Sequence, residues 1–436
     1  MGNQVQIQSD WISEAESRKA MRVAILAACF GGIPALLVNS SSIFILYATM
    51  LNSSRFVSLC TTALDSLAVF LFYMPLAYLM HRYGKKKLVI PAFIAGGIGL
   101  GLTAFAPFFG HFAEMILLAG LTVFSITTAF HIAAWFALLK DVVPETQRGR
   151  FFGHMRTAWQ VVVCIFLFVS TAIMRFSSSM LTFQIIILVA STGFFIRAWY
   201  THKIPEREPQ KDGISFVKSL RLIFRNQRLL GFGTYLFWLY MFSGSVVPVA
   251  ILMAKLVLKM NDDFLVLLSS CLMIGNIVGF FLGGHVVDRR GTKKVFLLTH
   301  FSFGILSLML LFVQGDSLVN EILLLVFVTL YGLVYSAASI AVSSETFAIV
   351  PDSSSEMGIA ACLGMYYAGL GLSRFVVGWI LDSGMLSNSW VLFGRLQLTQ
   401  YHTLFLISGF GVIVTCVLLV MIPSVVGKSR LIPEIR

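Results

Sequence analysis

The sequence is poor in charged residues. Only 12% of its 436 residues are Asp, Glu, Lys or Arg, about half the share of an ordinary soluble domain. Hydrophobic residues make up 58% of the chain, so the composition excludes a disordered protein and argues against a soluble enzyme. Apolar runs of roughly 18 residues or more recur along the chain, and each is long enough to cross a bilayer as a helix. The sequence therefore predicts a polytopic membrane protein.

Signatures of several other protein classes are missing. The sequence has no Walker lysine loop, HExxH or GxSxG motif, so ATP-driven transport and hydrolysis lack support. Its six cysteines lie in apolar runs without CxxC spacing, which predicts neither a disulfide framework nor a metal site. Residues 1–19 lack the apolar segment of a signal peptide. We expect no cofactor, no metal and no cleaved leader.

The basic residues outnumber the acidic ones, 32 to 20, which raises the question of nucleic-acid binding. In nucleic-acid-binding proteins the basic residues gather on one face, often among exposed aromatic residues. Here they stand in short clusters between apolar runs, as they do in cytoplasmic loops of membrane proteins. We expect no nucleic-acid partner.

Twelve apolar runs are long enough to span a membrane. Their ranges are 22–47, 56–80, 88–107, 112–139, 152–174, 180–200, 230–256, 264–286, 295–314, 321–345, 358–382 and 401–423. A polar stretch separates the sixth from the seventh, so we expect a tail (1–21), a six-helix bundle (22–200), a linker (201–229), a second six-helix bundle (230–423) and a tail (424–436). Residues 214–224 of the linker predict an amphipathic helix on the membrane surface.

The positive-inside rule orients these spans. If the N-terminus is cytoplasmic, the cytoplasmic segments hold 26 Lys and Arg and the outer loops hold 5, counting residues at span ends with the adjoining connection. This asymmetry predicts that both termini are cytoplasmic and that the number of spans is even.

Two connections between spans are similar in sequence. Residues 77–87 read AYLMHRYGKKK and residues 284–294 read GHVVDRRGTKK. Arg82 and Arg289 are 207 residues apart, which is nearly half the chain. Parallel repeats of six spans about an axis normal to the membrane characterise one large transporter architecture.

With these two loops on a twelve-span map, the sequence resembles the Major Facilitator Superfamily, whose signature loop reads G-x-x-x-D-R-x-G-R/K-K/R. The resemblance implies an all-α integral membrane fold of two pseudo-symmetric six-helix bundles. In the family this loop latches the cytoplasmic side when the carrier opens outward. The resemblance therefore implies gating roles for Asp288 and Arg289, and for His81 and Arg82 in the first copy. His81 departs from the aspartate of the signature, which puts the first latch in doubt.

Two charged residues lie inside predicted spans. Asp65 is about 14 Å from the outer end of span two, and Arg374 is about 10–12 Å from the outer end of span eleven. Ionisable groups in a membrane are costly and usually face the bundle interior or a water-filled path. In the family, spans two and eleven pack together between the halves, so we expect an Asp65–Arg374 bridge when the carrier faces inward. Each could instead find a partner within its own half.

Span four carries further candidates. His131 and Trp135 are four residues apart and share a helical face, and Glu114 lies near the outer end of the same span. In the family, the first helix of each three-helix unit lines the central cavity, so the resemblance suggests substrate contact or proton transfer for these residues. A single histidine in an apolar helix can equally be a hydrogen-bonded core residue, and Glu114 can be a solvated carboxylate at a helix start.

The other cavity helices implied by the resemblance supply hydroxyl, amide and aromatic groups. Buried Tyr and Trp residues need hydrogen-bond partners for their polar tips, which makes them more informative than the 39 phenylalanines. We select Asn39 in span one, Trp238 in span seven, and Tyr331 and Tyr335 in span ten as candidates for solute binding. Pro34 and Pro248 are expected to bend spans one and seven near the midplane, as in other carriers.

We therefore expect a secondary carrier that works by alternating access, is coupled to protons and moves a small polar or amphipathic solute. Its expected partners are that solute, protons and membrane lipids, and we expect a monomer that is not an enzyme. One alternative is a proton-antiporting exporter of amphipathic compounds, although span five lacks the regularly spaced glycines usual in such families. Another is a transporter-like receptor or scaffold, which would have no use for Asp65, His131 and Arg374 in the membrane. The compact loops favour a multi-pass protein of the cell membrane, specifically a bacterial inner membrane.

Overall fold

The computed structural model describes residues 12–144, 147–207, 221, 223–315, 317–350, 355–392 and 396–421. The elements are α1 (Glu14–Asn39), α2 (Ile43–Met50), α3 (Arg55–Tyr83), α4 (Lys85–Thr103), η1 (Ala106–Phe112), α5 (Ala113–Val142), α6 (Arg148–Phe176), α7 (Met180–His202), α9 (Gln227–Ser243), α10 (Val246–Leu256), α11 (Asp262–Arg290), α12 (Thr292–Met309), η3 (Leu310–Phe312), α13 (Leu318–Ile349), α14 (Ser355–Ser383), β1 (Ser389–Leu392), β2 (Leu396–Thr399) and α15 (Gln400–Met421). Twelve helical segments in this part of the chain are long and apolar enough to cross a membrane. The twelve spans predicted from the apolar runs are confirmed.

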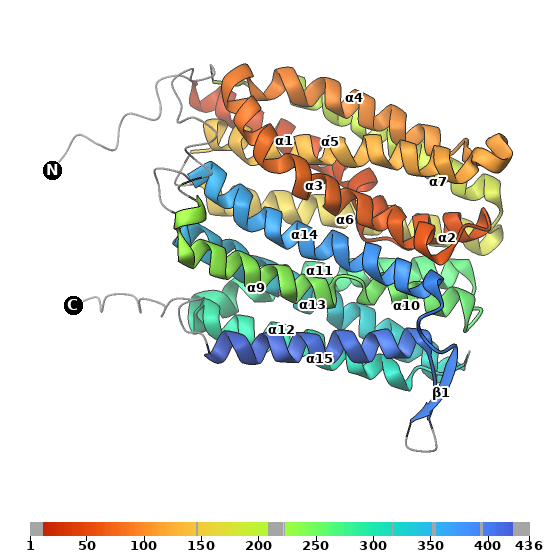
Figure 1. The fold of residues 1–436 in the computed structure, drawn as a ribbon. Helices are drawn as coiled ribbons and strands as arrows, with labels where there is room; N and C mark the ends of the chain where they lie inside the picture. Colours follow the sequence, from red (N-terminus) through yellow and green to blue (C-terminus); the bar gives the residue numbers. More distant parts are fainter. Residues whose placement is uncertain are drawn as a thin grey trace.

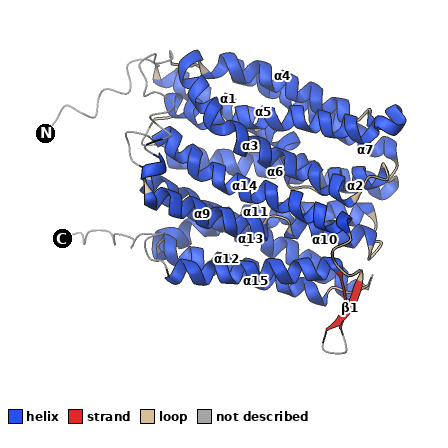
Figure 2. Cartoon of the chain, in the orientation of Figure 1, coloured by secondary structure: helices blue, strands red, loops and turns tan. Residues whose placement is uncertain are grey.

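The helices lie side by side and run back and forth between the two ends of one bundle (Figure 1). α1 begins and α15 ends at the same end of the bundle, which we call the termini face. The short helices α2 and α10 lie toward the opposite end, as does the antiparallel hairpin formed by β1 and β2. We call this end the hairpin face. Helices account for nearly all of the regular structure (Figure 2), so the all-α membrane fold is confirmed.

The repeat seen in the sequence is also present in the backbone. α3 and α11 each have 29 residues, and their first residues, Arg55 and Asp262, are 207 positions apart. Each ends at a glycine with positive φ, Gly84 at φ 96° and Gly291 at φ 77°, and the next helix starts directly after it. An L-residue with a side chain rarely adopts these angles, so the signature glycines let two antiparallel helices meet in a one-residue turn.

The halves meet along two pairs of helices. α3 packs against α14, and α6 packs against α11. Within the second half, α11 approaches α13 so closely that a Cβ atom on Gly279 would lie 2.2 Å from the backbone oxygen of Leu333. Small residues allow such contacts where helices have no hydrophobic driving force for association.

Two features differ from the prediction. α1 begins at Glu14, eight residues before the predicted span, because the Ser13 hydroxyl accepts a hydrogen bond from the Glu16 N–H while the Glu16 carboxylate accepts one from the Ser13 N–H. This capping box starts a helix in polar sequence that hydropathy does not detect. The second half carries the β hairpin between α14 and α15. Most of the predicted amphipathic helix over 214–224 lies outside the described residues.

Candidate functional site

The first span of each half is broken near its middle. Ser40–Ser42 separates α1 from α2, and Gly244 with Ser245 separates α9 from α10. Serine side chains compete with the helix for backbone hydrogen bonds, and glycine favours helix ends. Neither break falls at a proline, because α1 continues through Pro34 and Pro248 lies in the first turn of α10. At each break the last carbonyl groups of a helix have no partner within that helix.

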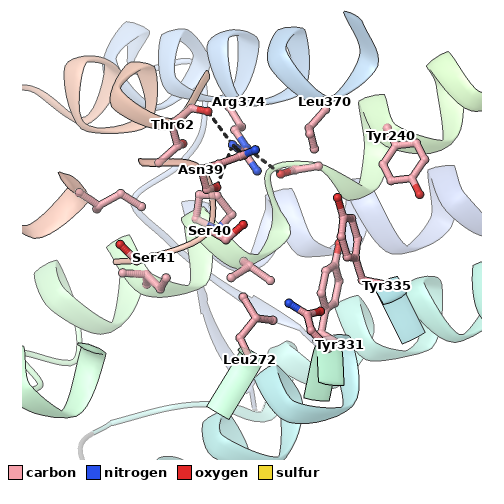
Figure 3. A pocket seen from close by; sticks show the side chains of 16 residues that line it. Asn39, Ser40, Ser41, Thr62, Tyr240, Leu272, Tyr331, Tyr335, Leu370 and Arg374 are labelled. Atoms are coloured by element: carbon pink, nitrogen blue, oxygen red, sulfur yellow. Dashed lines mark hydrogen bonds between the residues drawn. The ribbon is translucent and has the colours of Figure 1, made fainter. Parts of the chain in front are cut away.

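Arg374 of α14 reaches both breaks (Figure 3). Its Nε donates a hydrogen bond to the Gly244 oxygen at 3.1 Å, at the end of α9. Its Nη1 donates to the backbone and side-chain oxygens of Asn39, at 3.4 and 3.2 Å, and to the Thr62 oxygen at 2.6 Å. The C-terminal end of a helix carries partial negative charge, so it stabilises a cation. One buried arginine therefore caps two half-helices, one from each half of the protein.

Asp65 is connected to Arg374 through Asn39. The Asn39 Nδ2 donates to Asp65 Oδ2 at 3.2 Å, while the Asn39 side-chain oxygen accepts from Arg374. No ion pair joins Asp65 directly to Arg374 in the described part of the chain. The predicted direct bridge is therefore absent in this conformation, because carbonyl and amide oxygens take the Nε and Nη1 donors of Arg374. Asp65 is 2% exposed and its Oδ1 has no described hydrogen-bond partner.

Asn39 and Arg374 border a cavity of about 60 Å³ between the halves, whereas Asp65 is not among its lining residues. Its polar lining residues are Asn39, Ser40, Ser41, Thr62, Tyr240, Asn276, Tyr331, Tyr335 and Arg374, and they come from both halves. The volume is far below the roughly 300–1,000 Å³ of typical ligand pockets. In this conformation the cavity has room for a few waters or a small polar group. The predicted candidates Asn39, Tyr331, Tyr335 and Arg374 all border it.

Tyrosines form one wall of the cavity (Figure 3). The Tyr331 hydroxyl donates to the Ser243 oxygen at 2.7 Å, and the hydroxyl groups of Tyr335 and Tyr366 are 2.5 Å apart. Tyr240 packs its ring on Tyr366, with centroids 4.3 Å apart. Its hydroxyl is buried and has no hydrogen-bond partner among the described residues. A buried polar group without a partner is costly, which makes this hydroxyl a candidate contact for a bound solute.

A second buried arginine lies within the first half. Arg197 of α7 is 3% exposed, and its Nη2 is 2.9 Å from His131 Nε2. Its guanidinium lies over the rings of Phe93 and Trp135, 4.9 and 4.8 Å from the centroids. A Cβ atom on Gly31 would lie 2.2 Å from Arg197 Cδ, so the absence of a side chain there makes room for the arginine. Sequence reasoning placed Arg197 with the cytoplasmic linker, although it falls three residues inside the predicted end of span six.

The contact with Arg197 determines the form of His131. A guanidinium can only donate, so Nε2 must accept and the neutral imidazole carries its proton on Nδ1. Both His131 Nδ1 and Arg197 Nε are buried without a described partner. Trp135 is buried against the same guanidinium. The structure therefore brings His131 and Trp135 together with an unpredicted cation, and neither residue is among those that line the cavity.

Two other candidates lie away from the cavity. Trp238 is 49% exposed and stacks on Phe242, while Tyr240, two residues along α9, lines the cavity. Residues two apart lie on different faces of a helix, so Trp238 faces outward. Glu114 lies in the first turn of α5 and is partly exposed.

The predicted gating residues lie at the termini face. His81 and Arg82 are in the last turn of α3, and Arg289 is in the last turn of α11. The side chain of Asp288 lies outside the described part of the structure. Arg82 and Arg289 are exposed.

Two described contacts next to these loops stay within a half. The Lys85 ammonium is 2.5 Å from the Asp141 carboxylate in the first half. In the second half, the Thr292 hydroxyl donates to the Glu345 carboxylate at 2.8 Å. Lys85 and Thr292 are the first residues of the helices that follow the signature loops. Each loop is therefore held to the end of the next long helix of its own half.

Hydrogen bonds between the halves lie from the middle of the bundle to the hairpin face in the described chain. The Ser42 N–H donates to the Ser269 hydroxyl and the Ser42 hydroxyl donates to the Leu265 oxygen, both at 2.9 Å. The Phe56 N–H donates to the Asp382 carboxylate at 2.9 Å. At the termini face, an inter-half contact is the Arg156 guanidinium over the ring of Phe280. The described hydrogen bonds thus join the halves in the middle of the bundle and on its hairpin side.

Solved structures share this architecture. A variant of the nucleoside transporter NupG matches with a TM-score of 0.69 and 14% identity, covering 93% of this chain and 99% of that chain. A POT family transporter in complex with 5-aminolevulinic acid matches with a TM-score of 0.69, 13% identity and coverage of 96% and 98%. The xylose transporter XylE from E. coli, in a partially occluded inward-open conformation, matches with a TM-score of 0.68, 12% identity and coverage of 94% and 98%. At these identities the likeness establishes the fold alone.

A comparison with curated proteins gave no match. The sequence profile of the Major Facilitator Superfamily matches residues 28–353, about three quarters of the chain. This match extends from the first span through both signature loops. Together with the twelve spans and the 207-residue repeat, it shows that the chain is a multi-pass membrane protein that belongs to the Major Facilitator Superfamily.

Proposed function

We propose that the protein is a proton-coupled secondary carrier that moves a small polar solute by alternating access. The observation that supports this most is the position of Arg374, which contacts both helix breaks at the border of a cavity between the halves. When one half moves against the other, the hydrogen bonds of Arg374 to Asn39 and Thr62 in the first half must break or change partners. A solute that binds there can therefore influence which side of the membrane the cavity faces.

Asp65 is the proposed proton carrier. It is an ionisable group inside the bundle. Its carboxylate accepts a hydrogen bond from the Asn39 amide, which leads to Arg374, and it also hydrogen-bonds with the Thr128 hydroxyl of α5. Protonation turns one carboxylate oxygen into a donor, which weakens its acceptance from the Asn39 amide. The proton thus acts on the same side chain that helps to hold Arg374 to α1. His131 is a weaker candidate, because a second proton on its ring would break the contact with Arg197.

The conformation supports the alternating-access part of the proposal. The described hydrogen bonds between the halves lie from the middle of the bundle to the hairpin face. The ion pair of Lys85 and the hydrogen bond of Thr292, both next to the signature loops, stay within a half. In the proposed orientation, with both termini cytoplasmic, this corresponds to an inward-facing state. The opposite state would break the hairpin-face contacts and bring the loops of the two halves together.

The test is transport by purified protein in liposomes that hold a pH-sensitive dye. The panel should include nucleosides, sugars, short peptides and small carboxylic acids, because carriers of the same fold act on such different solutes. A substrate that enters with protons acidifies the lumen above the rate in protein-free liposomes. If no solute moves in either direction, the carrier proposal is wrong and a transporter-like receptor or scaffold is favoured. Solute efflux driven by inward proton flow would favour a proton-antiporting exporter.

A further inference from the structure

We propose that the cavity binds the carboxylate of a small organic anion, which pairs with Arg374 and is carried together with one proton on Asp65. This inference rests on the carrier function proposed above and specifies its substrate class. It is carried by the hydrogen bonds of Arg374, by the chemistry of the cavity lining, and by the balance of charge around Asp65.

Arg374 has a donor to spare. Its Nε and Nη1 donate to oxygens of Gly244, Asn39 and Thr62, but Nη2 meets no acceptor among the described residues. None of the acceptors carries a formal charge, so no carboxylate touches the guanidinium. A guanidinium binds a carboxylate best through two parallel N–H bonds. Nη2 supplies one, and Nη1 can supply the other by releasing the Asn39 side-chain oxygen at 3.2 Å.

The cavity lining has the chemistry of an anion site. Among the residues that the structure describes there, Arg374 is the one charged side chain, and no Asp or Glu contributes. The Tyr240 hydroxyl is buried without a partner and can donate to a bound oxygen. The remaining lining includes Ile45, Val247 and Leu272, which can cover an apolar tail. A cavity of about 60 Å³ favours a compact molecule, such as a short monocarboxylate.

The charge balance connects such an anion to a proton. Asp65 and Arg374 together carry no net charge, and Asn39 joins them. A bound carboxylate would leave one net negative charge among buried groups, which is unfavourable in a membrane. One proton on Asp65 restores neutrality. The Arg374 guanidinium on α14 is the described charge that acts on Asp65, and the Thr128 hydroxyl of α5 hydrogen-bonds with its carboxylate. Tyr367 of α14 lies near Asp65 but is a neutral phenol, and Arg374 keeps its proton throughout. Anion and proton should therefore bind cooperatively, and each should raise the affinity for the other by the same factor.

The first experiment compares acids with their neutral amides on the unmodified protein. Sodium propionate, lactate and benzoate are titrated against the detergent-purified protein at constant ionic strength, beside propionamide, lactamide and benzamide. The readout is the thermal unfolding midpoint, which a ligand of the folded state raises by mass action. At least one acid should raise the midpoint and its amide should not. Equal shifts for acid and amide, or no shift with any of the three acids, would overturn the inference.

Variants test the two roles separately. Arg374→Gln should weaken acid binding by about 10- to 100-fold, as expected for loss of a charged hydrogen-bond partner, whereas Arg175→Gln should leave it unchanged. Arg175 is a matched control because it lies exposed in the last turn of α6 and its loss changes the net charge equally. If Arg374→Gln binds the acids like the unmodified protein, the assignment to Arg374 is wrong.

Proton uptake tests the coupling in weakly buffered solution with an indicator dye. Acid binding should take up about one proton per protein molecule, and Asp65→Asn should bind acid without this uptake. Unchanged proton uptake in Asp65→Asn would contradict the role of Asp65. The result also separates this inference from the broader proposal. Proton-driven accumulation of a neutral solute would support the carrier function and contradict the proposal of a carboxylate substrate. An acid that binds without crossing the membrane would support the carboxylate site and contradict the carrier function.

Discussion

Asp65 and Arg374 are held on opposite sides of a single amide, that of Asn39. The amide nitrogen donates to Asp65 and the amide oxygen accepts from Arg374. This arrangement matches the polarity of each neighbour, so the two charges are linked without touching. The hydrogen bonds of this one side chain, at the break between α1 and α2, therefore join α1 to both α3 and α14.

Asn39→Leu tests this link. The change removes a hydrogen-bond partner from two buried charged groups at once, and we expect a loss of about 2–3 kcal/mol of stability together with loss of proton-driven transport. Thr122→Ala, on the exposed side of α5 and away from the cavity, is the control. The unfolding midpoint and lumenal acidification in liposomes provide the readouts. An Asn39→Leu protein as stable and active as Thr122→Ala would show that the link has no role.

Exchanging the two charges should not restore function. In Asp65→Arg with Arg374→Asp, the new carboxylate at position 374 would face the oxygens of Gly244, Thr62 and Asn39, which repel it. A direct ion pair predicts the opposite, because a swapped pair could still attract. We therefore expect the double variant to be no more active than either single one. Transport at or above half the unmodified rate would favour a direct bridge.

His131 is expected to position Arg197. His131→Gln keeps an acceptor for the Arg197 Nη2 and should fold and transport, whereas His131→Leu leaves the guanidinium without it and should lose about 1.5–3 kcal/mol. The unfolding midpoints of the two variants measure this difference. Should His131→Gln lose accumulation but keep downhill exchange, His131 would be a proton carrier after all.

The hairpin-face contacts should open during transport. The hydroxyl oxygens of Ser42 and Ser269 are 3.2 Å apart, so cysteines at both positions can form a disulfide with little backbone movement. In a background without the six native cysteines, oxidation should stop transport and a reductant should restore it. Pairing of either cysteine with an unchanged serine is the control. Undiminished transport by the crosslinked protein would rule out separation of the halves at this face.

The sequence predicts the fold well because its signals are local. Each apolar run marks a span, and the two copies of the loop that end at Gly84 and Gly291 reveal the repeat. Both depend on neighbouring residues and on a period that is visible in one chain. The signal for the start of α1 at Glu14 is equally local, but the capping box of Ser13 and Glu16 lies in polar sequence that a search for apolar runs does not test.

The site is less predictable because its contacts are distant in sequence. Asp65 and Arg374 stand out as charges in apolar runs. Asn39 does not stand out, because its role as their link depends on α1 ending at this residue, between the two charged side chains. Arg197 lies near the end of a predicted span, where a basic residue usually serves topology, and only its packing against Gly31 and His131 shows that it turns inward. Trp238 and Tyr240 have similar chemistry, and the rotation of α9 decides which of them reaches the cavity.

The most direct test of proton coupling compares two modes of transport in Asp65→Asn liposomes, using the solute found in the lumenal-pH screen. One mode is accumulation driven by a pH gradient, and the other is exchange of labelled for unlabelled solute without a gradient. We predict that the unmodified protein performs both and that Asp65→Asn keeps exchange but loses accumulation. Accumulation by Asp65→Asn equal to that of the unmodified protein would contradict the account.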